Sequence, residues 1–256
     1  MTEDQGLDQS NPKNYLKSEE EYFDRIEEYW QQADGNYSEN MNSLSRFVPR
    51  QALGYFLVRN EIFKQVLDVH GSVLDFGIYR GLAFFTWLSS AIYEHYNHIR
   101  KVSGFDSFEG FSAIGEQHRG KNDKDLALKV EGGMAWDGFD EISQGVDLHD
   151  KNRPLGDVNK GLLVKGDLPS SVENFLDDHD ETIVAMANFG LSLYERTLKI
   201  LQAIKPRLLK GSILVFEDLN QATWPGEGKA LFEVFDTSEH SLERLPYCPH
   251  ISWIRI

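Results

Sequence analysis

Two short segments of the sequence combine acidic residues with glycines in a pattern that suits a nucleotide-containing ligand. The first covers residues 75–81 and reads DFGIYRG, after an apolar run and before a second apolar stretch with the composition of a helix. The second covers residues 104–110 and reads GFDSFEG, where another short apolar run ends at Asp106. Glycine lets the backbone approach a ligand closely, and a carboxylate at a strand end can accept both hydroxyls of a ribose. We therefore expect Asp106 to bind a ribose; the alternative is that it only caps its own turn.

The spacing of the glycines argues against a nicotinamide dinucleotide. Gly77 and Gly81 are present, but the middle glycine of the GxGxxG fingerprint is missing. That glycine lets the chain approach a pyrophosphate, and an acid follows the fingerprint by about 20 residues, earlier than Asp106 does here. We therefore expect a cofactor without a pyrophosphate and disfavour a nicotinamide-dependent oxidoreductase.

Two further residues near these turns have two readings each. Asp167 follows a predicted strand, so it would lie at the same edge of the sheet, where ligands of parallel α/β folds collect. It would accept a hydrogen bond from an adenine amine or cap the helix that begins near Pro169. Phe108 would stack on a base or fill the core.

The elements that must position these turns alternate regularly. Apolar runs predict strands at about 72–77, 100–105, 161–165, 182–188 and 211–217, separated by helical patterns at about 81–94, 169–177, 194–206 and 227–236. The end of the chain, Leu242–Tyr247 and Ile251–Ile256, reads as two antiparallel strands. This alternation predicts an α/β protein with a Rossmann-like, doubly wound, mostly parallel sheet that ends in an antiparallel strand pair.

Two regions stand outside the alternation. Residues 1–45 form a polar segment with an amphipathic helix, in which Tyr22, Ile26 and Trp30 recur every four residues. We expect this helix to pack on the main domain, residues 46–256, or to form a homo-oligomer contact. The glycine-rich insert at about 112–160 is long for a connection and carries Trp136, so we expect an ordered lid or acceptor-recognition segment; disorder is the alternative.

Composition limits the classes of partner. The chain of 256 residues has 41% hydrophobic residues and a net charge of −15, which suit a folded acidic protein and exclude a binder of nucleic acid or of an anionic membrane. Cys248 is the single cysteine, so an intramolecular disulfide and a cysteine-rich zinc site are excluded. With no signal peptide and no membrane-length apolar run, we expect a soluble, cytoplasmic protein.

The segment GFDSFEG at 104–110 resembles the signature of class I S-adenosylmethionine-dependent methyltransferases of the macrocin O-methyltransferase type. Four further motifs of that family occur in the expected order: FVPRQ at 47–51, VKGD at 164–167, LYE at 193–195 and WPGE at 224–227. The resemblance therefore covers about residues 45–256. It implies a seven-stranded fold, S-adenosylmethionine as cofactor, and methyl transfer to a hydroxyl of a small polyhydroxylated acceptor such as a sugar or natural product. By position it also implies cofactor contacts from Asp75, Gly77, Tyr79, Gly81, Asp106 and Ser107, with Asp167 near the adenine.

The sequence departs from this family at one motif. Relatives commonly read D-x-D-L-Y-E after the fourth strand and use those acids, with a following acidic pair, to hold Mg²⁺. Here Gly190 and Ser192 replace the two aspartates, while Glu217 and Asp218 remain and neutral Asn188 or Ser192 is the best third ligand. Because a hard cation prefers several carboxylate oxygens, Mg²⁺ is a weak expectation.

Without a metal, another group must accept the proton of the acceptor hydroxyl. Asp218 and Glu217 are the candidate bases because their strand end should face the acceptor, and His250 is a further candidate that otherwise belongs to the turn of the terminal hairpin. The alternative function is a non-catalytic binding module or partner subunit that keeps the methyltransferase fold and has lost the metal site.

Overall fold

The computed structural model describes residues 17–111 and 130–256. Its contacts divide the chain into two units, residues 1–53 and 54–256, and the division falls inside helix α3 (Arg50–Lys64). The part of the predicted insert at 112–129 and the polar segment before residue 17 lie outside the described residues.

The N-terminal unit consists of short helices joined by polar turns. Helix α1 (Lys17–Gln31) confirms the predicted amphipathic helix, and α2 (Tyr37–Asn42) and the 3₁₀ turn η1 (Leu44–Arg46) follow. A capping box starts α2, where Asn36 and Glu39 each bind the other's backbone N–H. Trp30 packs edge-on against Phe47, with ring centroids 4.7 Å apart. The packing or oligomer contact expected of α1 stays a prediction.

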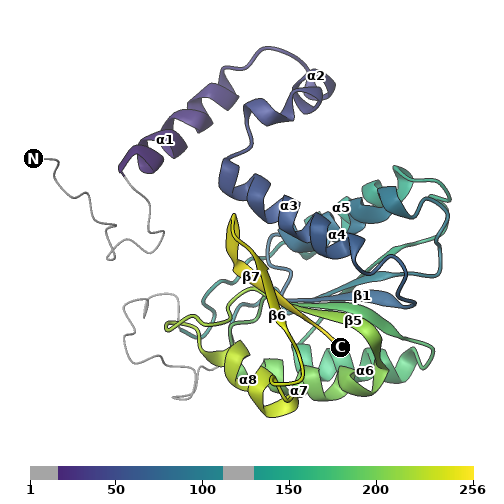
Figure 1. Cartoon of the computed structure of the whole chain (residues 1–256). Coiled ribbons are helices and arrows are strands. Elements are labelled where there is room, and N and C mark those ends of the chain that lie inside the picture. Colours follow the sequence, from purple (N-terminus) through teal and green to yellow (C-terminus); the bar gives the residue numbers. More distant parts are fainter. Residues whose placement is uncertain (1–16, 112–129) are drawn as a thin grey trace, which may run out of the picture. The chain divides into compact units, whose positions relative to one another are not determined.

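The second unit is built on one seven-stranded sheet, shown in Figure 1. Its strands are β1 (Ser72–Phe76), β2 (Val102–Asp106), β3 (Gly161–Lys165), β4 (Val184–Phe189), β5 (Leu208–Phe216), β6 (Leu242–Leu245) and β7 (Cys248–Arg255). The order across the sheet is β3-β2-β1-β4-β5-β7-β6; β1 to β5 are parallel, and β7 is antiparallel to both β5 and β6. The predicted doubly wound sheet with a C-terminal antiparallel pair is confirmed.

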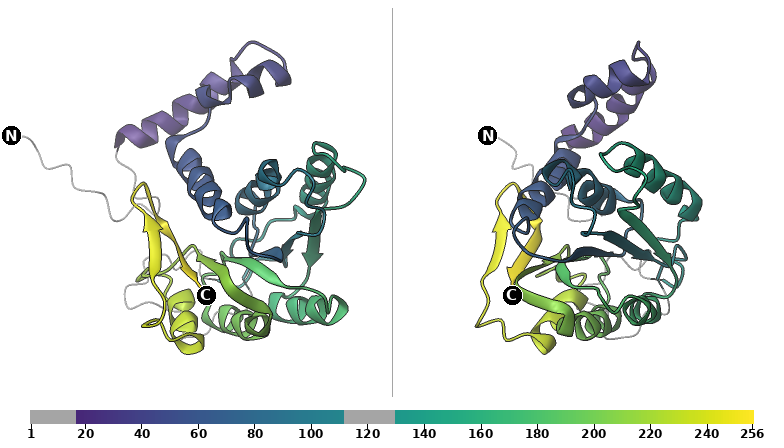
Figure 2. Two further views of the ribbon diagram at one scale, coloured as in Figure 1. Left: turned by 45° about the vertical axis from the view of Figure 1, so that its right-hand side comes forward. Right: turned by 90° about the vertical axis from the view of Figure 1, so that its right-hand side faces the viewer.

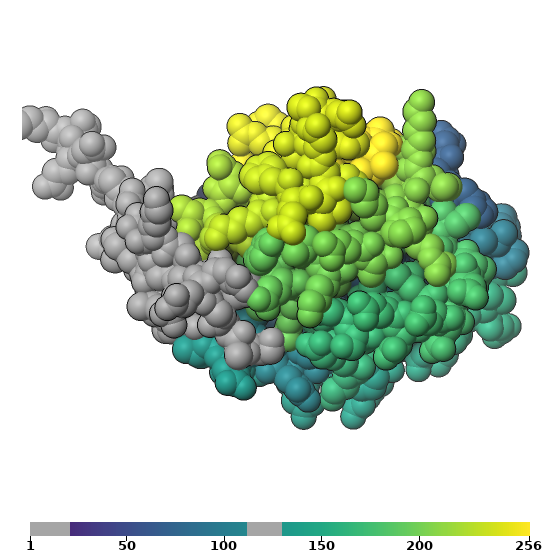
Figure 3. All heavy atoms as spheres, turned by 90° about the horizontal axis from the view of Figure 1, so that it is seen from below, coloured from purple at the N-terminus to yellow at the C-terminus, as the bar shows by residue number. Residues whose placement is uncertain are grey.

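Helices cover both faces of this sheet (Figures 1 and 2). One face carries residues 54–64 of α3, α4 (Leu82–Ser89) with the 3₁₀ turn η2 (Ser90–Tyr93), and α5 (Phe139–Lys151). The other carries α6 (Leu168–Asp178), α7 (Tyr194–Ile204) with the 3₁₀ turn η4 (Lys205–Arg207), and α8 (Gly226–Val234). Figure 3 shows the molecule from this side, where green residues lie next to the yellow residues of the C-terminal part of the chain. None of the helices in the described residues is long and apolar enough to cross a membrane.

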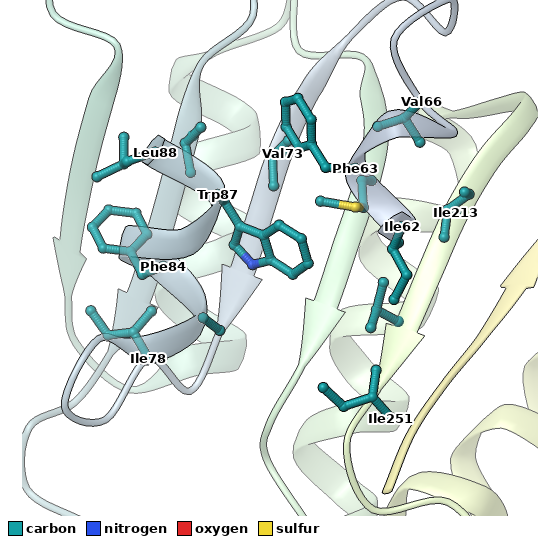
Figure 4. Packing of buried hydrophobic residues seen from close by; sticks show 14 of the residues in the cluster. Ile62, Phe63, Val66, Val73, Ile78, Phe84, Trp87, Leu88, Ile213 and Ile251 are labelled. Carbon is teal, nitrogen blue, oxygen red and sulfur yellow. The ribbon is translucent and has the colours of Figure 1, made fainter. Parts of the chain in front are cut away.

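Each face of the sheet has its own hydrophobic core. Figure 4 shows the first, where Trp87 of α4 and Phe63 of α3 pack against Val73 of β1. The second contains four strand-end phenylalanines whose rings are 5.1–5.2 Å from their neighbours: Phe105, Phe76, Phe189 and Phe216. Because side chains alternate along a strand, the residues just before two of these phenylalanines point to the opposite face. Asp75 and Asn188 therefore point toward the layer that contains α3.

Two predicted boundaries are wrong. The expected insert contains helix α5, whose sequence signal is weak because Gly138 stands at the N-cap position and Gly145 lies in its interior. The terminal hairpin turns earlier than expected, so Pro249 and His250 belong to strand β7 and not to the connecting turn. A register shift between Arg244 and Leu245 accommodates the proline, which cannot donate to the ladder.

Candidate functional site

The strand order reverses at β1, which lies between β2 and β4, and this reversal opens a crevice at the carboxyl ends of the strands. Two backbone segments meet there: Gly190 N donates to Phe76 O at 2.9 Å. Gly77 has a φ of +82°, and a Cβ added to it would lie 2.6 Å from Gly190 O. Glycine is thus required at position 77, both for its conformation and for the close approach of the two chains.

Asp106 joins the two turns that the sequence singles out. Its Oδ2 accepts a hydrogen bond from Tyr79 N at 2.9 Å, and its Oδ1 accepts one from Phe108 N at 2.8 Å. The turn-capping interaction is therefore present. Each carboxylate oxygen keeps a second lone pair, so ribose binding by the same carboxylate stays a valid prediction. Phe108 is 6% exposed and packs edge-on against Phe139, which favours its core reading.

A cavity of about 100 Å³ opens beside this carboxylate. Four residues expected to contact the cofactor line it: Gly77, Tyr79, Asp106 and Ser107. The other two, Asp75 and Gly81, are not among its lining residues. Asp75 is fully buried in β1, and a Cβ on Gly81 would meet the Phe85 ring at 2.7 Å and Ile142 at 3.0 Å. Met134, Trp136 and Leu168 complete the apolar wall, and none of them was predicted as a site residue.

Asp167 lies in an adjoining cavity of about 500 Å³, which shares Ser107 and Gly110 with the first. It occupies the N-cap position of α6, but its side chain makes no capping hydrogen bond to the backbone. Its Oδ1 is instead 3.4 Å from Nη2 of Arg196, which lines both cavities. The carboxylate therefore lies in the cavity next to the one beside Asp106, and its contact with the cofactor stays a prediction.

A further cavity, of about 340 Å³, extends the crevice toward β5 and β7. Glu217, Asp218 and His250 line it, so the structure brings the three candidate bases together. Its walls also include five residues of the first cavity, Gly77, Tyr79, Met134, Gly190 and Ser192. The two cavities thus form one groove, with the cofactor turns at one end and the carboxylate pair at the other.

A chain of buried polar groups lies at the carboxylate end of the groove. Arg59 Nη2 donates to Glu217 Oε1 at 2.6 Å, and Asn188 Nδ2 donates to the same oxygen at 3.1 Å. The same Asn188 nitrogen donates to Asp75 Oδ1 at 2.7 Å. Burial raises the pKa of Asp75 to about 7, against the hydrogen bond from Asn188, which lowers it. Asp75 therefore does not line the groove itself and is linked through Asn188 to Glu217, which does.

The second carboxylate of the pair is held differently. Ser192 Oγ donates to Asp218 Oδ2. Burial raises the pKa of Asp218, and the nearby Glu217 adds to this effect, while the Ser192 hydroxyl opposes it. Asp218 therefore has the environment of a base that works closer to neutral pH than an ordinary aspartate.

Glu227 fixes the loops that carry these groups. It is fully buried, and its Oε1 accepts from Leu191 N and Ser192 N, each at 3.0 Å, while its Oε2 accepts from Asp218 N at 3.0 Å. Burial and the neighbouring Asp218 raise the pKa of Glu227, while the three backbone donors lower it. One side chain of α8 thus ties the loop after β4 to the loop after β5.

His250 faces the groove from β7. Its Nδ1 lies 3.0 Å from Gln221 Nε2. This contact engages Nδ1, so Nε2 is the ring nitrogen left to meet a ligand in the groove. His250 therefore stays a candidate base, and it lines the same cavity as Glu217 and Asp218.

The donor set at Glu217 and Asp218 does not suit Mg²⁺. Glu217 Oε1 already accepts hydrogen bonds from Arg59 and Asn188. The Asn188 group that faces Glu217 is its amide nitrogen, and an amide nitrogen cannot coordinate a cation. Within residues 17–111 and 130–256, no cluster of three or more His, Cys, Asp or Glu side chains could hold a metal ion.

Backbone strain gives an independent indication of this site. Six residues other than glycine have positive φ in the described part of the chain, and four of them line the groove: Tyr79, Phe108, Met134 and Ser192. Such conformations cost of order 1–3 kcal/mol each and concentrate at functional sites. They depend on tertiary contacts, so the sequence gives no sign of them.

The fold has counterparts among solved structures. No family model matches the chain, and no curated protein does. The crystal structure of CalS11, a calicheamicin methyltransferase, matches with 31% identity and a TM-score of 0.87, covering 93% of each chain. The chain belongs to the CalS11 family of class I S-adenosylmethionine-dependent methyltransferases.

A second CalS11 structure, described as an apo TDP-rhamnose 3′-O-methyltransferase, matches this methyltransferase with 30% identity and a TM-score of 0.79, over 93% of this chain and 94% of that one. The O-methyltransferase NovP shares the fold at 16% identity and a TM-score of 0.59, over 82% of this chain and 81% of that one. The resemblance found in the sequence is confirmed, and S-adenosylmethionine is the cofactor of the family.

Proposed function

We propose that this methyltransferase transfers the methyl group of S-adenosylmethionine to a hydroxyl of a small polyhydroxylated acceptor, a sugar or a sugar-bearing natural product. The observation that carries the proposal is the single groove, in which Gly77, Tyr79, Gly190 and Ser192 belong to both the cofactor end and the carboxylate end. Methyl transfer needs the acceptor oxygen in line with the sulfonium methyl, and two adjoining cavities with common walls suit that arrangement.

The cofactor end would be held by the residues beside Asp106. Its free lone pairs would accept the ribose hydroxyls, and Asp167 in the adjoining cavity would accept from the adenine amine. Trp136 and Leu168 supply apolar surface for the base. Bound S-adenosylmethionine would supply an electrophilic methyl group on its sulfonium.

At the other end, Asp218 is the base that the geometry favours. The acceptor oxygen would form a bond to the methyl carbon while the carbon–sulfur bond breaks, and the hydroxyl proton would pass to the Asp218 carboxylate. Glu217 is less suited to this role because Arg59 and Asn188 already donate to it. His250 would contact another oxygen of the acceptor through Nε2, because Gln221 engages its Nδ1. The reaction thus needs a carboxylate that is not held in an ion pair, and of Glu217 and Asp218 only Asp218 meets this condition.

The relative suggests which acceptor to try first. CalS11 acts on TDP-rhamnose, a sugar joined to a nucleoside diphosphate. In a chain with a net charge of −15, a diphosphate needs a local cation, and Arg80 lines the acceptor cavity with its guanidinium 4.9 Å from the Trp136 ring centre. A guanidinium in the lining of this cavity favours a nucleotide-linked sugar over a neutral one.

Two measurements test the proposal in sequence. Calorimetry with S-adenosylhomocysteine should show saturable binding, and its absence at millimolar ligand would sink the cofactor assignment. Mass spectrometry should then show methylated product from a panel of nucleotide sugars that includes TDP-rhamnose. The non-catalytic alternative rests on the missing acids at 190 and 192, and it predicts binding of S-adenosylhomocysteine with no methyl transfer to any acceptor.

A further inference from the structure

The carboxylate end of the groove contains a buried, fixed positive charge. Arg59 is 2% exposed, and its Nη2 contacts Glu217 Oε1 at 2.6 Å. Its Nη1 donates to Tyr55 O at 3.2 Å, and the guanidinium carbon lies 5.5 Å from the centre of the Tyr55 ring. These contacts hold the guanidinium in one orientation, with one nitrogen on the carboxylate that faces the cavity.

Helix α3 holds Arg59 in its position beside Glu217. Its neighbours Val58, Ile62 and Phe63 are fully buried in the first core, so the helix cannot turn without exposing them. A buried guanidinium without a partner is costly, so Arg59 and Glu217 stay together as an ion pair. The Glu217 side chain is 26% exposed, which leaves the carboxylate side of the pair open to the groove.

The two positions where the family motif is altered face this ion pair and its neighbour. A Cβ added to Gly190 would lie 3.6 Å from the carboxyl carbon of Glu217, in ordinary contact. Ser192 already bonds to Asp218. Positions 190, 192, 217 and 218 therefore converge on one region, where carboxylates at all four would create the negative charge that attracts a divalent cation. In this chain only positions 217 and 218 are acids, and the guanidinium of Arg59 supplies the positive charge.

We propose that Arg59 takes the place of the divalent cation that the family motif implies, so that this methyltransferase works without a metal. The inference rests on the proposed function. Arg59 is a positioning residue: it neutralises Glu217 and fixes its orientation, so that Glu217 accepts a hydrogen bond from the acceptor without repelling the ionised Asp218. The guanidinium of Arg59 then replaces the metal, and the loss of the two acids at positions 190 and 192 removes the ligands that the metal would need.

The test measures metal affinity, because a merely structural arginine would not change it. Mg²⁺ and Mn²⁺ are titrated calorimetrically into the full chain, up to about 10 mM, above the range of weak protein sites for hard cations. The wild type should show no saturable binding, and the Gly190→Asp/Ser192→Asp variant should gain little because the guanidinium remains. Adding Arg59→Met should make binding at least about tenfold tighter than in the double variant. Adding Arg80→Met instead is the matched control for metal affinity, since it removes a cation from the same cavity but not from Glu217, and it should leave the metal affinity equal to that of the double variant.

Two results would overturn the proposal. One is equal metal affinity of the triple variant and the double variant, with both folded by thermal melting. The other is saturable Mg²⁺ binding by the wild type that Glu217→Gln abolishes, which decides the question even if the triple variant does not fold. S-adenosylhomocysteine is titrated into the same samples without metal. If the wild type does not bind S-adenosylhomocysteine, the proposed function is refuted, while the conclusion on metal affinity is unaffected.

Discussion

Replacing Glu227 with alanine should both destabilise the fold and weaken cofactor binding. The substitution leaves three backbone N–H groups, those of Leu191, Ser192 and Asp218, without their acceptor. A buried donor without a partner costs about 1–3 kcal/mol, but two of these three are only part-buried and can bind water in the space that opens. Removing a buried carboxylate also recovers some of its desolvation cost. We therefore expect a loss of about 3 kcal/mol, which lowers Tm by about 6–12 °C in a domain of this size.

Glu227→Gln should cost less, about 1–2 kcal/mol, because its carbonyl oxygen can keep the Leu191 and Ser192 bonds while its NH₂ faces the Asp218 N–H. Affinity for S-adenosylhomocysteine should fall in the same order, since the Gly190–Ser192 loop lines both cavities.

Thermal unfolding and calorimetry check both effects, with Glu233→Gln as the matched control. Glu233 lies on the same helix, is exposed, and accepts from the Tyr194 hydroxyl, so its substitution should change stability by less than about 0.5 kcal/mol. Glu227→Ala with a Tm equal to that of the control would show that the three bonds do not hold the loops, and the reasoning would be wrong.

Three further predictions concern the carboxylates of the groove. Asp106→Asn should weaken S-adenosylhomocysteine binding by about 10- to 100-fold in calorimetry, because one acceptor of the ribose hydroxyls becomes a donor; unchanged affinity would refute the ribose assignment. Asp218→Asn should lower kcat by about 10²- to 10⁴-fold, and the wild-type rate should rise with pH through the raised pKa of Asp218; an unaltered pH profile in the variant would exclude Asp218 as the base. Asp75 has a pKa raised from 3.8 to about 7, so the folded state holds a proton that the unfolded state has released, and wild-type stability falls as pH rises from about 4 to 7. Asp75→Asn, which can still accept from Asn188, should remove this fall, by as much as about 4 kcal/mol at pH 7; parallel pH dependences in urea unfolding would contradict the shift.

The sheet could be predicted from the sequence because its signals are local. Apolar runs that end at Asp75 and Asp106 mark strand ends, and alternation with helical patterns predicts a parallel order. Helix α5 could not be predicted because Gly138 and Gly145 weaken its pattern, and tertiary packing of Ile142 and Val146 in the first core overrides that preference.

Some residues of the candidate site could likewise be predicted from the sequence, and others could not. Asp106 and the Glu217–Asp218 pair stand at strand ends and are visible in the sequence, whereas Arg59 is separated from Glu217 by 158 positions and lies within an ordinary helical pattern. Glu227 reads as a surface acid at a helix start, yet it is fully buried. Its importance comes from three backbone donors that only the folded chain brings together.

The most direct test of the central claim follows the methyl group itself. The full chain is incubated with S-adenosylmethionine labelled at the methyl carbon and a nucleotide-linked deoxysugar such as TDP-rhamnose, and carbon NMR locates the label. One groove that joins the cofactor turns to Asp218 predicts a labelled methyl on a sugar oxygen in the wild type and its near loss in Asp218→Asn. Binding of S-adenosylhomocysteine with no labelled product across the panel of sugars, or a label on nitrogen or carbon of the acceptor, would contradict it.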